Sequence, residues 1–163
     1  MLLTAIEAVR LLDLKPLQTQ GGMAKLTYAG KAMEGGKATS TAIYYLLSKD
    51  AFSHMHRLPT DEVFHFYLGS KVELLELFPD GRHRITILGT DISAGEKPQH
   101  VVPAGVWQGA RLVAGGDFAL LGKTIAPGFI DSDYEQGNGT LLANQYPKVR
   151  DLINKLTGEA VPF

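Results

Sequence analysis

The chain has 163 residues, of which 45% are hydrophobic and 20% are charged, and its formal net charge is −1. A chain of this length buries about 70% of the surface that its unfolded form exposes, which suffices for one ordinary globular domain. No basic stretch offers contacts to phosphates, so the composition argues against a nucleic-acid partner. Since the sequence contains no cysteine, disulfides, thiolate nucleophiles and cysteine-ligated zinc sites are excluded.

The N-terminal segment predicts a short helix and no membrane contact. Thr4 and Glu7 form a capping-box pattern, and hydrophobic residues then recur at helical spacing, which predicts a helix over residues 4–13. Glu7 and Arg10 interrupt the apolar run and no basic region precedes it, so the segment matches neither a signal peptide nor a membrane span. We therefore expect a cytoplasmic protein.

The middle of the chain consists of short runs rich in β-branched and aromatic residues. These runs predict strands over residues 24–28, 41–47, 62–68, 71–78, 83–88, 100–102, 110–113 and 118–125. Turn signals at residues 69–70 and 79–81 predict consecutive hairpins. Many short strands with no helices between them favour a sandwich or a barrel.

The C-terminal part predicts a second helix. Pro147 suits a first helical position, and the hydrophobic residues between 149 and 156 fall on one helical face. No linker, repeat or low-complexity tract divides the sequence. We therefore expect a single domain over residues 1–163.

Two segments carry a resemblance to a known fold family. The segment FSHMHRLPTDEVFHFYLG (52–69) resembles the first cupin motif, and VPAGVWQ (102–108) resembles the core of the second. Together with TAIYYLL (41–47) and APGF (126–129), they make the chain similar to an uncharacterised cupin family, DUF985 or cupin 5. The resemblance implies a mainly β fold, a double-stranded β-helix jelly-roll barrel with short N- and C-terminal helices. It does not imply a reaction, because cupins host many functions.

The resemblance also implies a metal-ligand set of His54, His56, Glu62 and Gln108. The two histidines share one strand face, because side chains alternate with period two. His54 is more typical of a strand edge near solvent than of a ligand. Gln108 stands where the second motif has a histidine, and five residues instead of three or four separate His56 from Glu62. An amide oxygen is a weaker ligand than an imidazole nitrogen, so we expect no cofactor or a weakly bound divalent metal.

His56 and Glu62 are the candidate groups for proton transfer. Glu62 begins a strand that otherwise reads Val, Phe and Phe, and a carboxylate in such a strand is rarely buried without a partner or a task. A histidine–carboxylate pair inside a barrel is typical of general acid–base chemistry. Tyr44 is the candidate third catalytic group as a phenol acid, although Tyr45 is the alternative, since only one of the two neighbours faces inward.

Further residues are candidates for contacts to a ligand. Phe64 and Phe66 share the face of Glu62 and would line the same interior, as plain core residues also would. Trp107 is a candidate floor for a sugar or aromatic ligand, although a core tryptophan is the commoner outcome, and Gln108 is expected to face the interior. Arg84 is a candidate anchor for an anion, with a surface salt bridge as the alternative.

Three functions remain open at this point. The first is an isomerase, epimerase or lyase that acts by proton transfer on a small sugar-like or hydroxy-acid substrate. The second is a non-catalytic protein that binds a small ligand, and the third is a metal-dependent enzyme. The sequence does not decide whether the chain is an enzyme. We also expect a homodimer, because cupins of this size commonly pair through their sheets.

Overall fold

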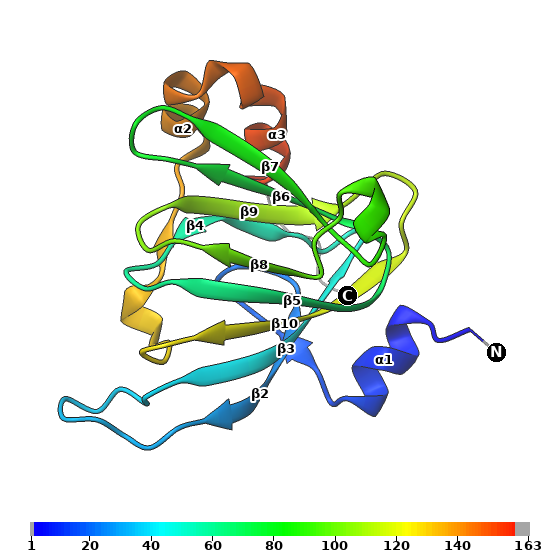
Figure 1. Ribbon diagram of the computed structural model, residues 1–163, viewed down its shortest axis with the longest axis vertical. Helices are drawn as coiled ribbons and strands as arrows, with labels where there is room; N and C mark the ends of the chain where they lie inside the picture. Colours follow the sequence, from blue (N-terminus) through cyan, green and yellow to red (C-terminus); the bar gives the residue numbers. More distant parts are fainter. Residues whose placement is uncertain (1, 159–163) are drawn as a thin grey trace.

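The computed structural model describes residues 2–158, in which two antiparallel β-sheets face each other (Figure 1). After the first three strands, which share one sheet, successive strands cross from one sheet to the other at every step but one. This winding is that of a jelly roll, so the predicted fold, a mainly β barrel with short terminal helices, is confirmed. None of the helices in residues 2–158 is long and apolar enough to cross a membrane.

The larger sheet has six strands, in the order β1-β2-β3-β10-β5-β8. The strands are β1 (Lys15–Pro16), β2 (Met23–Ala29), β3 (Thr41–Ser48), β10 (Phe118–Ile125), β5 (Glu62–Gly69) and β8 (Gln99–Val102). β10, the last long strand of the chain, lies between β3 and β5 and pairs with both along most of its length. The centre of this sheet therefore joins segments that are distant in the sequence.

The smaller sheet has five strands, in the order β11-β4-β9-β6-β7. The strands are β11 (Glu135–Gln136), β4 (Ser53–Arg57), β9 (Trp107–Leu112), β6 (Val72–Leu77) and β7 (His83–Leu88). β6 and β7 form a hairpin, as the turn signal at residues 79–81 predicts. The turn at residues 69–70 instead carries the chain from β5 in one sheet to β6 in the other, so the hairpin predicted there is wrong.

The two inner sheet faces enclose the main hydrophobic core. Alternate residues of both sheets are buried there, as expected for strands with one face inward. The core consists of Tyr45, Leu47, Phe64, Phe66, Val72, Leu74, Leu88, Val102, Val106, Ala110, Leu112, Ala119 and Leu121. Polar residues that share these faces must therefore lie inside the barrel.

Short helices cover the outer faces of the sheets. α1 (Ala5–Leu11) begins at the capping box of Thr4 and Glu7 and packs near β3 and β10. α2 (Gly139–Gln145) and α3 (Arg150–Lys155) pack through Leu142, Leu152 and Ile153 on the outer face of the smaller sheet, at the top of Figure 1. Three 3₁₀ turns, η1 (Ile92–Ala94), η2 (Asp131–Asp133) and η3 (Pro147–Val149), complete the elements of the described residues.

Candidate active site

A row of polar side chains crosses the inner face of the smaller sheet. His56 on β4 is opposite Gln108 on β9, Gln108 is opposite Glu76 on β6, and Glu76 is opposite Arg84 on β7. Directly opposed residues of antiparallel strands have Cβ atoms about 4.5–5.5 Å apart. Neighbouring side chains of the row are therefore close enough to contact the same bound molecule.

A β-bulge in β4 decides which histidine enters the barrel. The register between β4 and β9 shifts between Ser53 and His56, so that these two residues, three positions apart, oppose inward-facing residues of β9. Met55 packs on the outer face against the C-terminal helices. His54 lies in the bulge, half-buried, with its ring stacked on Phe52 at a centroid distance of 4.6 Å. The expectation that His54 and His56 share one face is therefore wrong, because the bulge interrupts the period of two.

His56 is fully buried and neutral. Its Nδ1 lies 2.6 Å from the backbone carbonyl oxygen of His54, and a carbonyl can only accept, so Nδ1 carries the proton. Burial, and then the positive charge of Lys123, lower the pKa of His56 to about 3. Its Nε2 is buried without a hydrogen-bond partner among the described residues. His56 therefore presents one free acceptor nitrogen to its surroundings.

Lys123 supplies a positive charge inside the barrel. It lies on β10 opposite Phe64, and its side chain is only 1% exposed. Its Nζ donates a hydrogen bond to Oε1 of Gln20 at 3.1 Å and lies 3.4 Å from Oε1 of Glu62. The same atom lies 4.1 Å from the ring centroid of Tyr45 and 4.8 Å from that of Phe64. Burial lowers the pKa of Lys123, whereas Glu62 opposes this effect.

Glu62 and Gln108 present further free acceptors. Both carboxylate oxygens of Glu62 and Oε1 of Gln108 are buried without a hydrogen bond to any described residue. Glu62 is 1% exposed and Gln108 is 2% exposed. Native proteins leave only a few buried polar atoms unpaired, so such a concentration marks a place for a polar occupant.

A short segment, the strap, covers His56; it comprises Asp131–Gln136, that is η2 and β11. The ring of Tyr134 stacks on that of His56 at a centroid distance of 5.2 Å, and its hydroxyl donates to the carbonyl of Thr19 at 3.0 Å. Two hydrogen bonds from Arg57 to Glu135, of 2.6 and 2.9 Å, fix the end of the strap. Burial raises the pKa of Tyr134 to about 12, so the phenol stays protonated.

An open groove of about 520 Å³ lies on the outside of the strap. It is lined by Arg57, Leu58, Pro59, Gly105, Ser132, Asp133, Tyr134 and Glu135. Because Tyr134 contacts both the groove and His56, it stands between the surface and the buried polar atoms.

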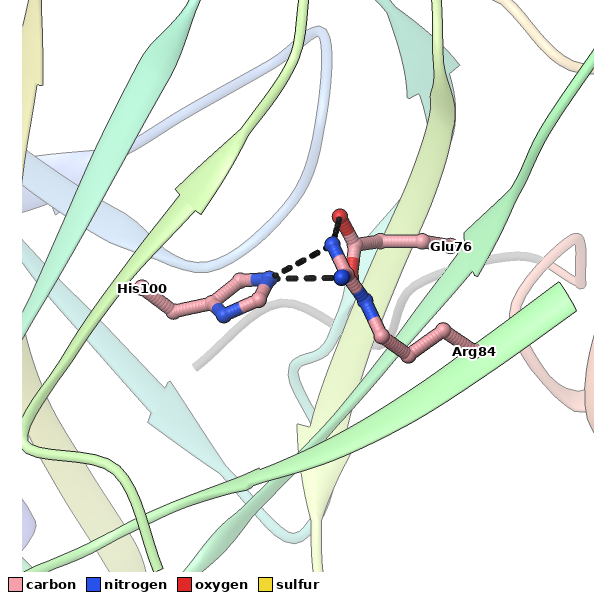
Figure 2. A network of polar contacts seen from close by, with 3 residues as sticks. All are labelled: Glu76, Arg84 and His100. Atoms are coloured by element: carbon pink, nitrogen blue, oxygen red, sulfur yellow. Dashed lines mark hydrogen bonds and ion pairs between the residues drawn. The ribbon is translucent and has the colours of Figure 1, made fainter.

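A second charged cluster, drawn in Figure 2, joins the edges of the two sheets. Arg84 donates two hydrogen bonds to Glu76, of 2.8 and 2.9 Å, and Nε2 of His100 on β8 lies 2.9 Å from Oε2 of Glu76. Burial raises the pKa of Glu76, but the hydrogen bonds from His100 and Arg84 outweigh it and leave this pKa lowered. Arg84 is thus paired with Glu76, which is the salt-bridge alternative and not the free anion anchor.

Two other expected site residues lie outside the barrel. Tyr44 is on the outer face of β3, where its ring meets that of Tyr67 edge-on at 6.3 Å, whereas its neighbour Tyr45 is in the core. Trp107 lies on the helix-covered face of β9, with the guanidinium of Arg57 4.5 Å above its ring. The structure thus corrects the expectations for Tyr44 and Trp107, because each has the opposite strand parity to the inward-facing residues.

The remaining expected residues lie inside. Phe64 and Phe66 are core residues of β5, and Phe64 faces Lys123. Lys123 itself was not among the expected site residues, although the signal that singled out Glu62 was present. The strand FALLGKTI carries a single charge in an apolar run, and Lys123 shares its parity with the buried Leu121.

The residues present do not fit the expected metal site. Within residues 2–158, no group of three or more His, Asp or Glu side chains could hold a metal ion. His54 lies in the bulge rather than beside His56, and Glu62 already pairs with the ammonium of Lys123. A divalent cation at Glu62 would stand close to this fixed positive charge, which disfavours its binding.

Fold and site together define a cupin-type jelly roll whose buried polar interior is centred on a lysine–glutamate pair. The model of the family Cupin_5, cupin superfamily (DUF985), matches residues 6–137. The chain belongs to this family, so the predicted membership is confirmed.

Two proteins of known structure are similar over nearly the whole chain. Protein SO0799 from Shewanella oneidensis is 30% identical, with a TM-score of 0.90 over 96% of this chain and 99% of that one. A hypothetical protein from Leishmania major is 26% identical, with a TM-score of 0.84 over 96% of this chain and 100% of that one.

Two further matches are more limited. The uncharacterised protein YML079W of Saccharomyces cerevisiae is 31% identical over 98 residues, which are 58% of this chain and 49% of the yeast protein. The match therefore spans about half the length of that relative. Oxalate decarboxylase from Bacillus subtilis is 14% identical, with a TM-score of 0.58 over 92% of this chain and 39% of that one. This last likeness shows a shared fold alone.

Proposed function

We propose that the barrel interior binds a small polar molecule, on which Glu62 transfers a proton while His56 orients a hydroxyl group, as in an isomerase, epimerase or lyase. The observation that carries the proposal is the set of buried atoms without partners among the described residues: Nε2 of His56, both carboxylate oxygens of Glu62 and Oε1 of Gln108. An unpaired buried polar atom costs about 1–3 kcal/mol, so four of them favour a polar occupant.

Glu62 is the proposed base. Its carboxylate has no hydrogen-bond donor from the described residues, and its nearest charged neighbour is the ammonium of Lys123, 3.4 Å away. An oxygen that no donor occupies is free to remove a proton from a bound molecule.

His56 is the proposed acceptor for a hydroxyl group of that molecule. With Nδ1 committed to the carbonyl of His54, its Nε2 lone pair is available. Its low pKa of about 3 keeps it neutral, so it orients a hydroxyl and receives hydrogen bonds instead of supplying a proton. Gln108, directly opposite on β9, adds an amide that both donates and accepts. This combination suits a polyhydroxylated or hydroxy-acid ligand.

The strap marks the side of the barrel from which we expect the ligand to enter. Tyr134 lines the groove outside the strap, and its ring is stacked on that of His56. In this proposal the ligand enters from this side when Tyr134 moves.

Proton transfer at carbon can be tested before the substrate is identified. We would incubate the protein in D₂O with a panel of aldoses, ketoses and 2-hydroxy acids and follow the loss of carbon-bound hydrogen by ¹H NMR. The wild type is expected to exchange at least one class. Glu62→Gln is expected to lower the rate about 10²- to 10⁴-fold through the loss of the base, and His56→Asn to lower it through the loss of a hydrogen-bond acceptor. The exposed His83→Asn and Glu34→Gln variants are the matched controls.

The same panel separates the alternatives. No exchange in any compound, or exchange that both variants leave unchanged, would overturn the enzymatic proposal. A rise in thermal stability with a panel member, without exchange, would instead support a small-ligand-binding protein, since a ligand specific for the folded state stabilises it.

A further inference from the structure

Lys123 is held by contacts that suit a charged ammonium group. Its Nζ lies 4.1 Å from the ring centroid of Tyr45 and 4.8 Å from that of Phe64, and aromatic faces attract cations at such distances. Gln20 accepts one of its hydrogens at 3.1 Å, and Glu62 supplies the compensating negative charge. A neutral amine would gain much less from these neighbours.

The surroundings of Lys123 also fix its position. Tyr45 donates its hydroxyl hydrogen to the carbonyl of Gly21 at 2.8 Å, which holds the ring against the lysine. Gln20, which accepts a hydrogen bond from Lys123, precedes that glycine in the same loop. Lys123 is fully buried on the central strand β10 and is held by these contacts in the interior. The charge is therefore preorganised.

An ammonium group has three donors, and Lys123 does not use them all on oxygen atoms. One hydrogen goes to Gln20, and the separation of 3.4 Å from Glu62 is an ion pair without a hydrogen bond of good geometry. At least one donor therefore remains available for an oxygen atom of a bound molecule, close to the proposed base.

We infer that Lys123 is the electrophile of this site and that its substrate is an uncharged α-hydroxy aldehyde or ketone. This inference rests on the proposed function and names its substrate class. Lys123 and Glu62 carry charges of opposite sign that cancel, so a neutral molecule would bring no further charge into the interior. An added carboxylate would leave one buried negative charge without a partner at this pair.

The proposed step leaves the net charge of the site unchanged. Glu62 removes the proton from the carbon next to the carbonyl group; the electron pair of the broken C–H bond forms a C=C bond. The carbonyl π electrons move to the oxygen, which becomes an enediolate oxygen beside the ammonium of Lys123. The negative charge thus passes from Glu62 to the substrate oxygen and stays beside the ammonium of Lys123 throughout. A positive group fixed in advance where the charge develops is what electrostatic catalysis requires. Return of the proton from Glu62 to carbon reverses the charge movement.

Lys123 also accounts for the poor fit of the metal-ligand set. In the expected metal site a divalent cation would polarise the substrate oxygen. Here a side chain of the protein supplies a positive charge beside the same carboxylate, and the described residues contain no third His, Asp or Glu to complete a metal site.

The inference can be tested with glycolohydroxamic acid, which is uncharged at pH 7 and whose ionised form is a planar analogue of an enediolate. We would measure its binding by isothermal titration calorimetry to the wild type, to Glu62→Gln and to the double variant Glu62→Gln/Lys123→Met. Because the double variant removes both charges, it leaves no unpaired ion inside the barrel. Lys155→Met, on the exposed face of α3, is the control for the loss of a lysine. Circular dichroism would verify that each variant is folded.

We expect Glu62→Gln to bind the probe, the double variant to bind it about 100-fold more weakly, and Lys155→Met to match the wild type. At pH 7, binding to the wild type should leave the number of bound protons unchanged, because the proton that the hydroxamic acid loses neutralises the Glu62 carboxylate. Binding to Glu62→Gln should instead release a proton, and titrations in two buffers of different ionisation enthalpy measure this difference. Equal affinity of Glu62→Gln and the double variant, or no binding by either, would overturn the role of Lys123.

The exchange experiment in D₂O distinguishes the two proposals. If the hydroxamate binds through Lys123 but no α-hydroxy aldehyde or ketone exchanges, the anion site stands and the proposed function fails. If such compounds exchange and Lys123→Met exchanges them at the wild-type rate, the proposed function stands and the inference fails. Exchange of 2-hydroxy acids alone would overturn the assigned substrate class.

Discussion

The buried, neutral state of His56 predicts a specific loss of stability in mild acid. In the unfolded chain a histidine has a pKa near 6.5, whereas burial and the charge of Lys123 hold the pKa of His56 at about 3 in the folded protein. Between these values the unfolded state binds a proton that the folded state does not bind. The free energy of unfolding therefore rises with pH in this window and falls as the pH decreases below about 6.5.

The size of the effect follows from the difference in pKa. Each pH unit within the window is worth about 1.4 kcal/mol, so acidification to pH 4.5 costs about 2–3 kcal/mol through His56 alone. His56→Asn removes the titrating group and keeps a donor near the position of Nδ1, which can still reach the carbonyl of His54. The variant should lose correspondingly less stability than the wild type over this pH range.

Urea unfolding at pH 7.5, 5.5 and 4.5 would measure the difference between the wild type and His56→Asn. The difference removes contributions that the two proteins share, and His83→Asn, at an exposed position, should keep the pH dependence of the wild type. A wild-type-minus-variant difference that changes by less than about 0.5 kcal/mol between pH 7.5 and 4.5 would refute the reasoning. So would an NMR titration of the His56 ring with a midpoint above pH 5.

Three further variants probe the architecture. Glu76→Gln should lower the free energy of unfolding by about 1–3 kcal/mol at pH 7. Because the pKa of Glu76 is lowered in the folded protein, this advantage of the wild type should decrease as the pH falls below about 4.5 and be lost below the folded pKa. An unchanged difference between the two proteins at pH 3 would contradict this. Gly22→Ala should cost about 1–3 kcal/mol in urea unfolding, because φ is +74° and the new Cβ would lie 2.8 Å from a ring atom of Tyr45. Gly115→Ala, with φ of +88° and nothing within 4 Å, shares the backbone strain without the clash, so equal costs would refute the role of the ring. Ile153→Ala should lower stability by about 2–5 kcal/mol because this side chain is fully buried under the smaller sheet, and a thermal midpoint within 1 °C of the wild type would contradict that packing.

The strands were predictable because their signal is local. The runs at 41–47, 83–88 and 118–125 match β3, β7 and β10 to within one residue, since β-branched and aromatic residues between turn signals determine such elements. The fold class followed from the resemblance of two motifs. By contrast, α2 over Gly139–Gln145 was missed; Asn138 caps it, but the helix contains a glycine and few periodic hydrophobic residues.

The site was predictable in part, and the predictions that were wrong have a common cause. Glu62, His56 and Gln108 are inside the barrel as expected. Glu62 was indicated by a local signal, a carboxylate in an apolar strand, whereas His56 and Gln108 were indicated by their positions in the two cupin motifs. The faces of His54, Tyr44 and Trp107 depend on strand register and on the bulge in β4, which only the paired strands determine. The expected homodimer and cytoplasmic location stay predictions.

The position of β10 has a consequence for how the protein folds. β10 fills the gap between β3 and β5, so the larger sheet stays divided until the chain has been made as far as residue 125. Pairing between such distant segments is slow, in the range of milliseconds to seconds for proteins rich in non-local contacts. The nascent chain therefore exposes two unpaired strand edges before β10 is available, and such edges are prone to aggregation. Because Lys123 lies on β10, the polar interior is among the last parts of the molecule to assemble, and a protein that fails to insert this strand also lacks its site.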